Sequence, residues 1–121
     1  MKVSDKLNAF GELFIEEVRD RTIDKFYRIV EGKMKDSNSL ELHNLISRLD
    51  ENAKSVLSRV ALDIIDNQMF NTLTVFEQNE DYILGYIDDE ETLHNMNDES
   101  DGLAGELFGD DGWIKKHSKF E

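Results

Sequence analysis

The sequence predicts an α+β, helix-dominated fold, in which three to four helices over about residues 4–78 precede a small β-hairpin and an irregular acidic C-terminal segment over about residues 80–121. Apolar residues recur every three or four positions through the first part, which is the period of an amphipathic helix. After Asn79 the pattern changes to two short stretches of aromatic and β-branched residues, which is typical of strands. The 121 residues contain no proline, so long helices are permitted, and residues 1–121 have the length of a single domain.

The first helical stretch begins after Ser4, whose side chain suits an N-cap position, and continues to Val30. The charged segment Arg19–Thr22 interrupts its apolar stripe. This segment is either a charged turn of one long helix or a break, in which case Thr22 would cap the second piece. Gly32 follows the last apolar residue and predicts the end of the helix, because glycine readily adopts the left-handed conformation found there.

Two further helices are predicted before residue 78. Ser39 is expected to cap a short helix whose apolar residues extend to Leu49. Asp50 is expected to cap the longest periodic segment, with Glu51 in its first turn, where the helix dipole favours negative charge. The side chains expected to form the core come from the apolar faces of these helices and from one tryptophan further on: Phe10, Phe14, Val18, Phe26, Leu45, Leu57, Val60, Ile64, Phe70, Leu73, Phe76 and Trp113.

The second part of the chain predicts a hairpin followed by an irregular segment. Tyr82–Ile87 and Thr92–Met96 are expected to be its strands, joined by the acidic cluster Asp88–Glu91. Because two strands alone are marginally stable, the hairpin is expected to pack on the helices or to be extended by later residues. Leu103–Phe108 is expected to form a short helix or a strand, and Gly109–Gly112 predicts a turn. The apolar residues expected to anchor this segment to the core are Trp113, Ile114 and Phe120.

Charge is distributed unevenly along the chain. Of the formal net charge of −13, residues 1–76 carry −2 and residues 77–121 carry −11. Between Arg59 and Lys115 there are 55 residues with 15 carboxylates and no lysine or arginine. Such a field repels nucleic acid and anionic lipid and attracts cationic partners. The sequence therefore predicts a basic protein partner and no binding to nucleic acid or membrane.

Other features of the composition indicate the cellular compartment of the protein. The chain has no cysteine, which excludes disulfides and thiolate metal sites and is typical of a reducing compartment. No apolar run approaches the ~18 residues of a membrane span, and the N-terminus becomes polar too early for a signal peptide. We therefore expect a cytoplasmic protein.

Neither a metal site nor a catalytic motif is predicted. With Asn97 as position one of an EF-hand, Gly102 falls at position six as the motif requires, but Phe108 stands at position twelve, where a bidentate glutamate is needed. Asp63 and Asp66 lie one helical turn apart, but a carboxylate-bridged metal bundle also needs Glu-x-x-His motifs, which are absent. No nucleophile or phosphate-binding motif is present either. The sequence predicts a non-enzymatic protein without a cofactor, and the two aspartates are expected to be helix-surface charges.

One cluster combines carboxylates with tyrosines over twelve residues. Tyrosine anchors surrounded by charge are common in protein interfaces, and acidic surfaces steer basic partners onto themselves. The alternative is that the tyrosines alternate into a core while the acids only solvate a hairpin. The residues of this candidate partner-binding site are Glu80, Asp81, Tyr82, Tyr86, Asp88, Asp89, Glu90 and Glu91.

The stretch Ser100–Ile114, together with the preceding segment Asp66–Glu77, resembles small uncharacterised bacterial proteins of the polymorphic-toxin immunity type. The resemblance covers about the C-terminal half and implies a bacterial, cytosolic, non-enzymatic protein. With the acidic segment, it leads to the prediction of an immunity-type inhibitor that occludes a basic toxin or enzyme surface. The alternative is a homo-oligomeric helical protein whose acidity serves solubility only.

Overall fold

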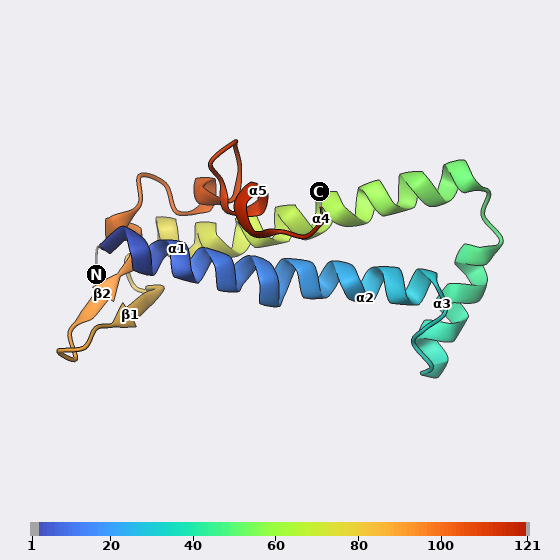
Figure 1. The fold of residues 1–121 in the computed structure, drawn as a ribbon, viewed down its shortest axis with the longest axis horizontal. Coiled ribbons are helices and arrows are strands. Elements are labelled where there is room, and N and C mark those ends of the chain that lie inside the picture. Colours follow the sequence, from blue (N-terminus) through green and yellow to red (C-terminus); the bar gives the residue numbers. More distant parts are fainter. Residues whose placement is uncertain (1–2, 121) are drawn as a thin grey trace.

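The computed structural model describes residues 3–120 and confirms the helix-dominated α+β fold. Helix α1 (Val3–Phe14), the π-helical segment η1 (Ile15–Asp20) and helix α2 (Arg21–Val30) follow one another as one long helix. Helix α4 (Glu51–Gln78) returns beside it in the opposite direction, and α3 (Ser37–Ser47) connects the two at one end of the molecule (Figure 1). The hairpin lies at the other end.

The long helix does not break at Arg19–Thr22, so the alternative of one continuous helix is confirmed. Backbone angles at Phe14 (φ −62, ψ −42) and Arg21 (φ −62, ψ −40) stay helical on both sides of η1. A π turn holds one residue more than an α turn, and such turns are frequent at special sites. Within this wider turn Arg19 and Asp20 face inward and are only 2% and 4% exposed.

The helix ends follow local capping rules, with two corrections. Ser4 was expected to cap the first helix, but α1 begins at Val3 and Ser4 lies within it. Gly32 adopts a φ of 75° just after α2, as predicted. The N-cap of α3 is Asp36 and not Ser39, because the Asp36 carboxylate accepts a hydrogen bond from the Ser39 backbone N–H at 3.0 Å. Asp50 caps α4 as predicted and accepts from the Ala53 N–H at 2.8 Å.

The hairpin is antiparallel and shorter than the sequence indicated. Strands β1 (Gly85–Ile87) and β2 (Leu93–Asn95) pair with Tyr86 opposite His94. Asp88–Glu91 forms the connecting turn, as expected. The Met96 N–H donates to the Leu84 carbonyl at 2.9 Å and extends the pairing by one hydrogen bond toward the helices.

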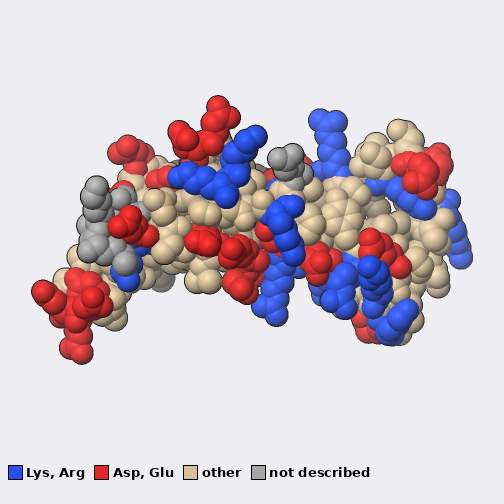
Figure 2. All heavy atoms as spheres, in the orientation of Figure 1, with Lys and Arg blue, Asp and Glu red and all other residues tan. Residues whose placement is uncertain are grey.

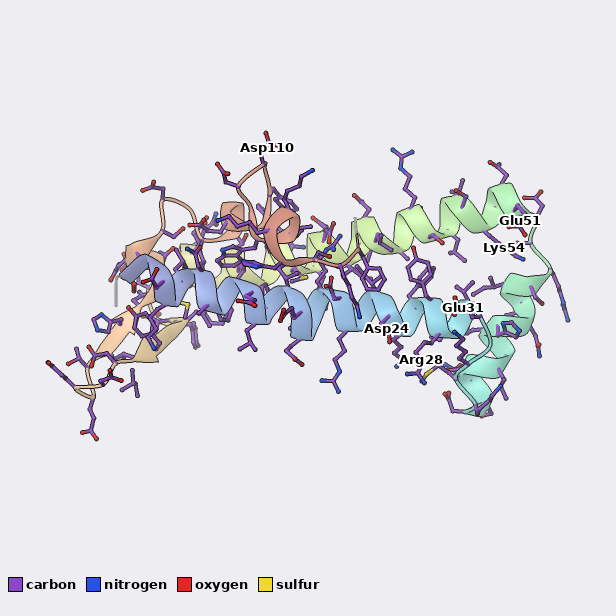
Figure 3. All side chains as sticks on the ribbon, in the orientation of Figure 1. Asp24, Arg28, Glu31, Glu51, Lys54 and Asp110 are labelled. Carbon is purple, nitrogen blue, oxygen red and sulfur yellow. The ribbon has the colours of Figure 1, made fainter. Side chains whose placement is uncertain are left out.

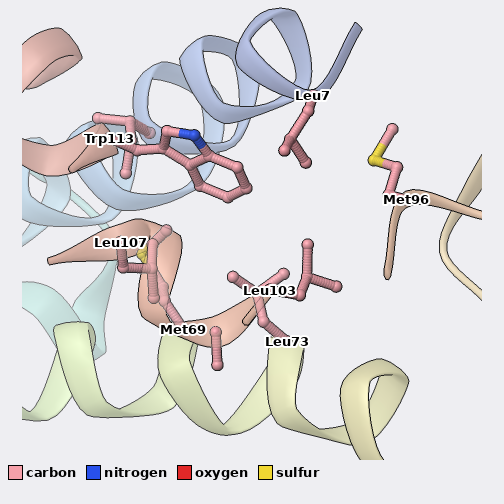
Figure 4. Close-up of a cluster of buried hydrophobic side chains, with 9 residues drawn as sticks. Leu7, Met69, Leu73, Met96, Leu103, Leu107 and Trp113 are labelled. Atoms are coloured by element: carbon pink, nitrogen blue, oxygen red, sulfur yellow. The ribbon is translucent and has the colours of Figure 1, made fainter. Parts of the chain in front are cut away.

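The segment after the hairpin forms a third layer over α1 and α4. It contains the 3₁₀ turns η2 (Met96–Glu99) and η3 (Ala104–Leu107) and the short helix α5 (Trp113–His117). η3 packs on α4 and α5 packs on α1. Figure 4 shows side chains of this layer meeting those of both helices. The buried cluster comprises Leu7, Ile15, Met69, Leu73, Met96, Leu103, Ala104, Leu107 and Trp113.

The predicted core is correct in part. Leu73 and Trp113 are buried, and the rings of Phe10, Phe14 and Phe76 pack against the buried cluster. Periodicity identifies the apolar side of a helix, but it does not show how far another element covers that side. For this reason five predicted core residues are wrong and lie 36–60% exposed: Val18, Leu45, Val60, Ile64 and Phe70.

Candidate functional site

The hairpin carries most of the acidic and aromatic residues that the sequence singled out. It projects from the end of the molecule at which α1 begins and α4 ends (Figure 1). Figure 2 shows a group of acidic side chains at this projecting tip, beside little basic surface. The turn Asp88–Glu91, here called the acidic tip, supplies four carboxylates in succession.

Asp88 organises the turn. Its Oδ1 accepts hydrogen bonds from the backbone N–H groups of Glu90 and Thr92, both at 2.9 Å. Its Oδ2 lies 2.7 Å from Nε2 of His94 on the opposite strand. These hydrogen bonds, the one to His94 first, lower the pKa of the Asp88 carboxyl. Asp88 therefore shapes the tip as an ionised carboxylate.

The other three carboxylates of the acidic tip are available to a partner. Asp89, Glu90 and Glu91 are exposed, and no lysine or arginine between residues 3 and 120 forms an ion pair with them. Glu91 has a φ of 63°, in a region that favours glycine or asparagine. A glutamate at this position carries a conformational cost, which is a feature often found at functional sites.

The two tyrosines of the cluster have different surroundings. The ring of Tyr86 stacks on His94 with centroids 4.9 Å apart, and its hydroxyl donates to Glu99 Oε1 at 2.8 Å. Partial burial and this bond to a carboxylate raise the pKa of the Tyr86 phenol. Tyr86 thus holds the hairpin against η2, whereas Tyr82 is 66% exposed and free to contact another protein.

The exposed apolar residues of the hairpin and of the segment leading into it were missed by the sequence reasoning. Ile83, Ile87 and Leu93 are 41%, 66% and 59% exposed. The signal that could have found Ile87 is the alternation of strand faces, because its neighbour Tyr86 points inward. Glu80 and Asp81, also exposed, precede this apolar group along the chain. Along the chain, Ile83 and Ile87 therefore lie between two groups of predicted acids, and Ile87 pairs with Leu93 across the hairpin.

A second polar cluster ties the end of the chain to the helices. Arg19 Nε donates to Asp66 Oδ1 at 2.6 Å, and Arg19 Nη1 donates to the Ser118 hydroxyl at 2.6 Å and the Phe120 carbonyl at 3.0 Å. The Ser118 hydroxyl in turn donates to Asp20 Oδ1 at 2.6 Å. Asp66 is therefore an ion-pair partner inside the fold, and its expected role as a helix-surface charge is wrong. Every member of this cluster is engaged within the chain, so it serves the fold.

The hairpin can recognise a partner non-covalently, through charge and apolar contact. Among residues 3–120, no group of three or more histidine, aspartate or glutamate side chains is arranged to hold a metal ion. In the same part of the chain, no helix is both long and apolar enough to cross a membrane.

Comparisons with known proteins give no relative: no family model matches this chain, and neither the curated proteins nor the solved structures contain a significant match.

Proposed function

We propose that this protein is an acidic, non-enzymatic binding protein whose hairpin occludes a basic surface of a toxin or enzyme, in the manner of an immunity-type inhibitor. The main support for the proposal is the set of side chains exposed at the projecting hairpin. Its acidic tip forms no ion pair with any lysine or arginine between residues 3 and 120, and the same hairpin region exposes Tyr82 and the aliphatic residues Ile83, Ile87 and Leu93.

This combination suits a binding surface in two ways. Carboxylates raise the rate of encounter with a basic partner, from ~10⁵–10⁶ M⁻¹s⁻¹ toward 10⁸ M⁻¹s⁻¹ or more at low salt. Apolar and tyrosine side chains then supply the desolvated contact that determines the lifetime of the complex. Tyr82 and Ile87, each 66% exposed, are the residues best placed for that contact.

The fixed shape of the turn supports the same function. Asp88 is held by three hydrogen bonds, and Tyr86 fastens the strand to η2. A surface that is ordered before it binds loses less conformational entropy on binding. The cysteine-free sequence suits a reducing compartment, so we place the interaction in the cytoplasm.

The test begins with capture of the partner from lysate of the source organism at low salt, elution with a salt gradient, and identification by mass spectrometry. Binding of the captured protein is then measured for two charge variants. Asp89→Lys combined with Glu90→Lys alters the acidic tip but keeps the structural Asp88. The matched control is Asp110→Lys combined with Asp111→Lys, which changes the net charge equally at two exposed residues of the Gly109–Gly112 turn. Asp110 points away from the helices there (Figure 3).

We expect the tip variant to bind at least about tenfold more weakly, mostly through a slower association rate, and the control to bind nearly as the natural protein does. We also expect the affinity of the natural protein to fall steeply with salt. Equal losses of affinity in the tip variant and the control variant would show that binding depends on the net charge of the protein and not on the acidic tip. An affinity that changes neither with the salt concentration nor with the tip substitutions would refute the proposed function.

A further inference from the structure

The end of the molecule opposite the hairpin carries an apolar surface that residues 3–120 leave uncovered. A groove of about 760 Å³ lies between α2 and the first half of α4. Its apolar lining consists of Tyr27, Val56, Val60 and Leu62, and its polar lining of Arg19, Ser58, Arg59, Asp63 and Asp66. The third layer meets α4 at Met69 and Leu73, in the second half of the helix, and Figure 1 shows that it does not extend along the first half.

The apolar surface of α4 at this groove has a regular form. Val56, Val60 and Ile64 are spaced four residues apart and are 54%, 47% and 60% exposed. Residues at this spacing form a ridge along the helix, and packing such ridges against each other is the commonest way in which two helices meet. On α3, at the same end of the molecule, Leu42, Leu45 and Leu49 are 39–50% exposed as well. Exposed apolar surface of this extent is uncommon on a monomer and usually marks an interaction site.

The charge of this end suits a second copy of the same chain. Two molecules of net charge −13 repel each other strongly at their acidic ends. Residues 21–64 contain eight basic and seven acidic residues, a net charge of +1, so this end can approach its own copy without repulsion. Acidic and basic residues are interleaved along α2 and at its C-cap, as Asp24, Arg28 and Glu31 show (Figure 3). Neither a strongly basic nor a strongly acidic partner is favoured here.

The ridge is also self-complementary. If two α4 helices cross in opposite directions with a twofold axis at Val60, then Val56 of each copy meets Ile64 of the other. The neighbouring ridge carries Arg59 and Asp63, one turn apart and on the same flank. Between residues 3 and 120 neither side chain forms an ion pair. The same axis brings Arg59 of each copy within reach of Asp63 of the other, which gives two equivalent ion pairs.

The geometry points to a twofold symmetric dimer formed through the first half of α4, with Val60 at the centre of the interface. This inference is independent of the proposed function, because its residues lie at the opposite end from the hairpin. In this dimer the acidic hairpin ends of the two copies lie far from the twofold axis, so they do not repel each other.

The experiment is sedimentation equilibrium of the full chain and of matched variants, at concentrations from about 1 to 100 μM. Val60→Asp places a charge at the centre of the interface. Val75→Asp is the control, because Val75 lies on the same helix with nearly the same exposure, 49% against 47%. Both side chains are exposed in the monomer, so circular dichroism is expected to show folded protein for both.

We expect the natural chain and the Val75→Asp variant to be dimeric and the Val60→Asp variant to dissociate at least about tenfold more readily. A monomeric natural chain at on the order of 100 μM would overturn the inference, as would equal behaviour of the two variants.

A charge exchange tests the twofold arrangement separately. Arg59→Asp and Asp63→Arg are each expected to weaken the dimer, because like charges then meet across the interface. The double variant restores opposite charges at both symmetric pairs, so the dimer is expected to recover. A double variant that is weaker than either single variant would exclude the arrangement with Val60 on the axis.

Discussion

Gly11 lies where α1 meets the only tryptophan of the chain, and replacing it by alanine tests how tightly the third layer is seated. Trp113 is 1% exposed, and its indole lies against the backbone of α1 at Gly11. A Cβ atom at position 11 would lie 2.5 Å from Cε2 and Nε1 of Trp113 and 2.6 Å from Cδ1. Comfortable contact between such atoms needs about 3.5–4.0 Å. The ring would therefore have to retreat by about 1 Å.

Two opposing effects determine the sign of the change. Alanine is favoured over glycine inside a helix by about 0.8–1 kcal/mol. Inserting a methyl group into a closely packed region costs about 1–3 kcal/mol or more. Phe10 packs on Trp113 with centroids 5.8 Å apart, so the ring cannot move without disturbing its neighbours. We expect the packing cost to exceed the helical gain and Gly11→Ala to lower the free energy of unfolding by about 1–2 kcal/mol.

The assay is urea unfolding followed by circular dichroism and by fluorescence of Trp113, which reports directly on the third layer. The control is Gly105→Ala, because a Cβ at position 105 would meet nothing within 4 Å. That substitution is expected to leave the free energy of unfolding nearly unchanged. If Gly11→Ala proves as stable as the natural chain, then Trp113 has room to move and the reasoning about a rigid contact is wrong.

Two further predictions concern charged groups. Arg19→Met is expected to lower the free energy of unfolding by about 2–4 kcal/mol, since it removes the cation that pairs with the buried Asp20 and the part-buried Asp66, although the 25% exposure of the Asp66 side chain limits the loss. The neighbouring Arg21→Met, which removes only the exposed pair with Glu17, is expected to cost under about 1 kcal/mol in the same urea titration. Similar losses for the two arginines would contradict the role of burial. The pKa of Asp88 is lowered in the folded state, so its contribution to stability is present at pH values above its unfolded pKa of about 3.9 and disappears as the pH falls through the folded pKa. An NMR titration of the Asp88 carboxyl is expected to give a midpoint below 3.8, and a midpoint above that value would show that its hydrogen bonds do not favour the charged form.

The sequence predicted the local elements better than their packing. Gly32 and Asp50 mark helix ends through local conformational preferences, so the structure confirms both. The π turn at Ile15–Asp20 could not be predicted, because it depends on Arg19 finding Asp66 and Ser118, 47 and 99 residues away along the chain. Leu103 and Leu107 were expected in a short helix or a strand of the acidic segment and were not assigned to the core. Both are fully buried, and this could not be predicted because their burial depends on two helices that are distant in sequence.

The residue composition identified the candidate site, and the structure then showed which roles its residues have. The acidic turn follows directly from the spacing of the two strand-like stretches. The sequence could not separate the roles of Tyr82 and Tyr86, because the difference depends on Glu99 and His94, which reach Tyr86 only after the hairpin and η2 have formed. The sequence also could not show that Ile87 and Leu93 are exposed, because the exposure of a side chain depends on how the whole chain packs.

The order of the layers along the chain has a consequence for synthesis. The apolar faces of α1 and α4 are covered by Leu103, Leu107 and Trp113, which leave the ribosome after both helices. Trp113 follows the end of α4 by 35 residues, so at ~5–20 residues per second the nascent helices remain uncovered for about 2–7 s. The carboxylate-rich stretch of residues 77–101 emerges within that interval. Its charge would keep neighbouring nascent chains on a polysome apart until the third layer arrives and closes the core.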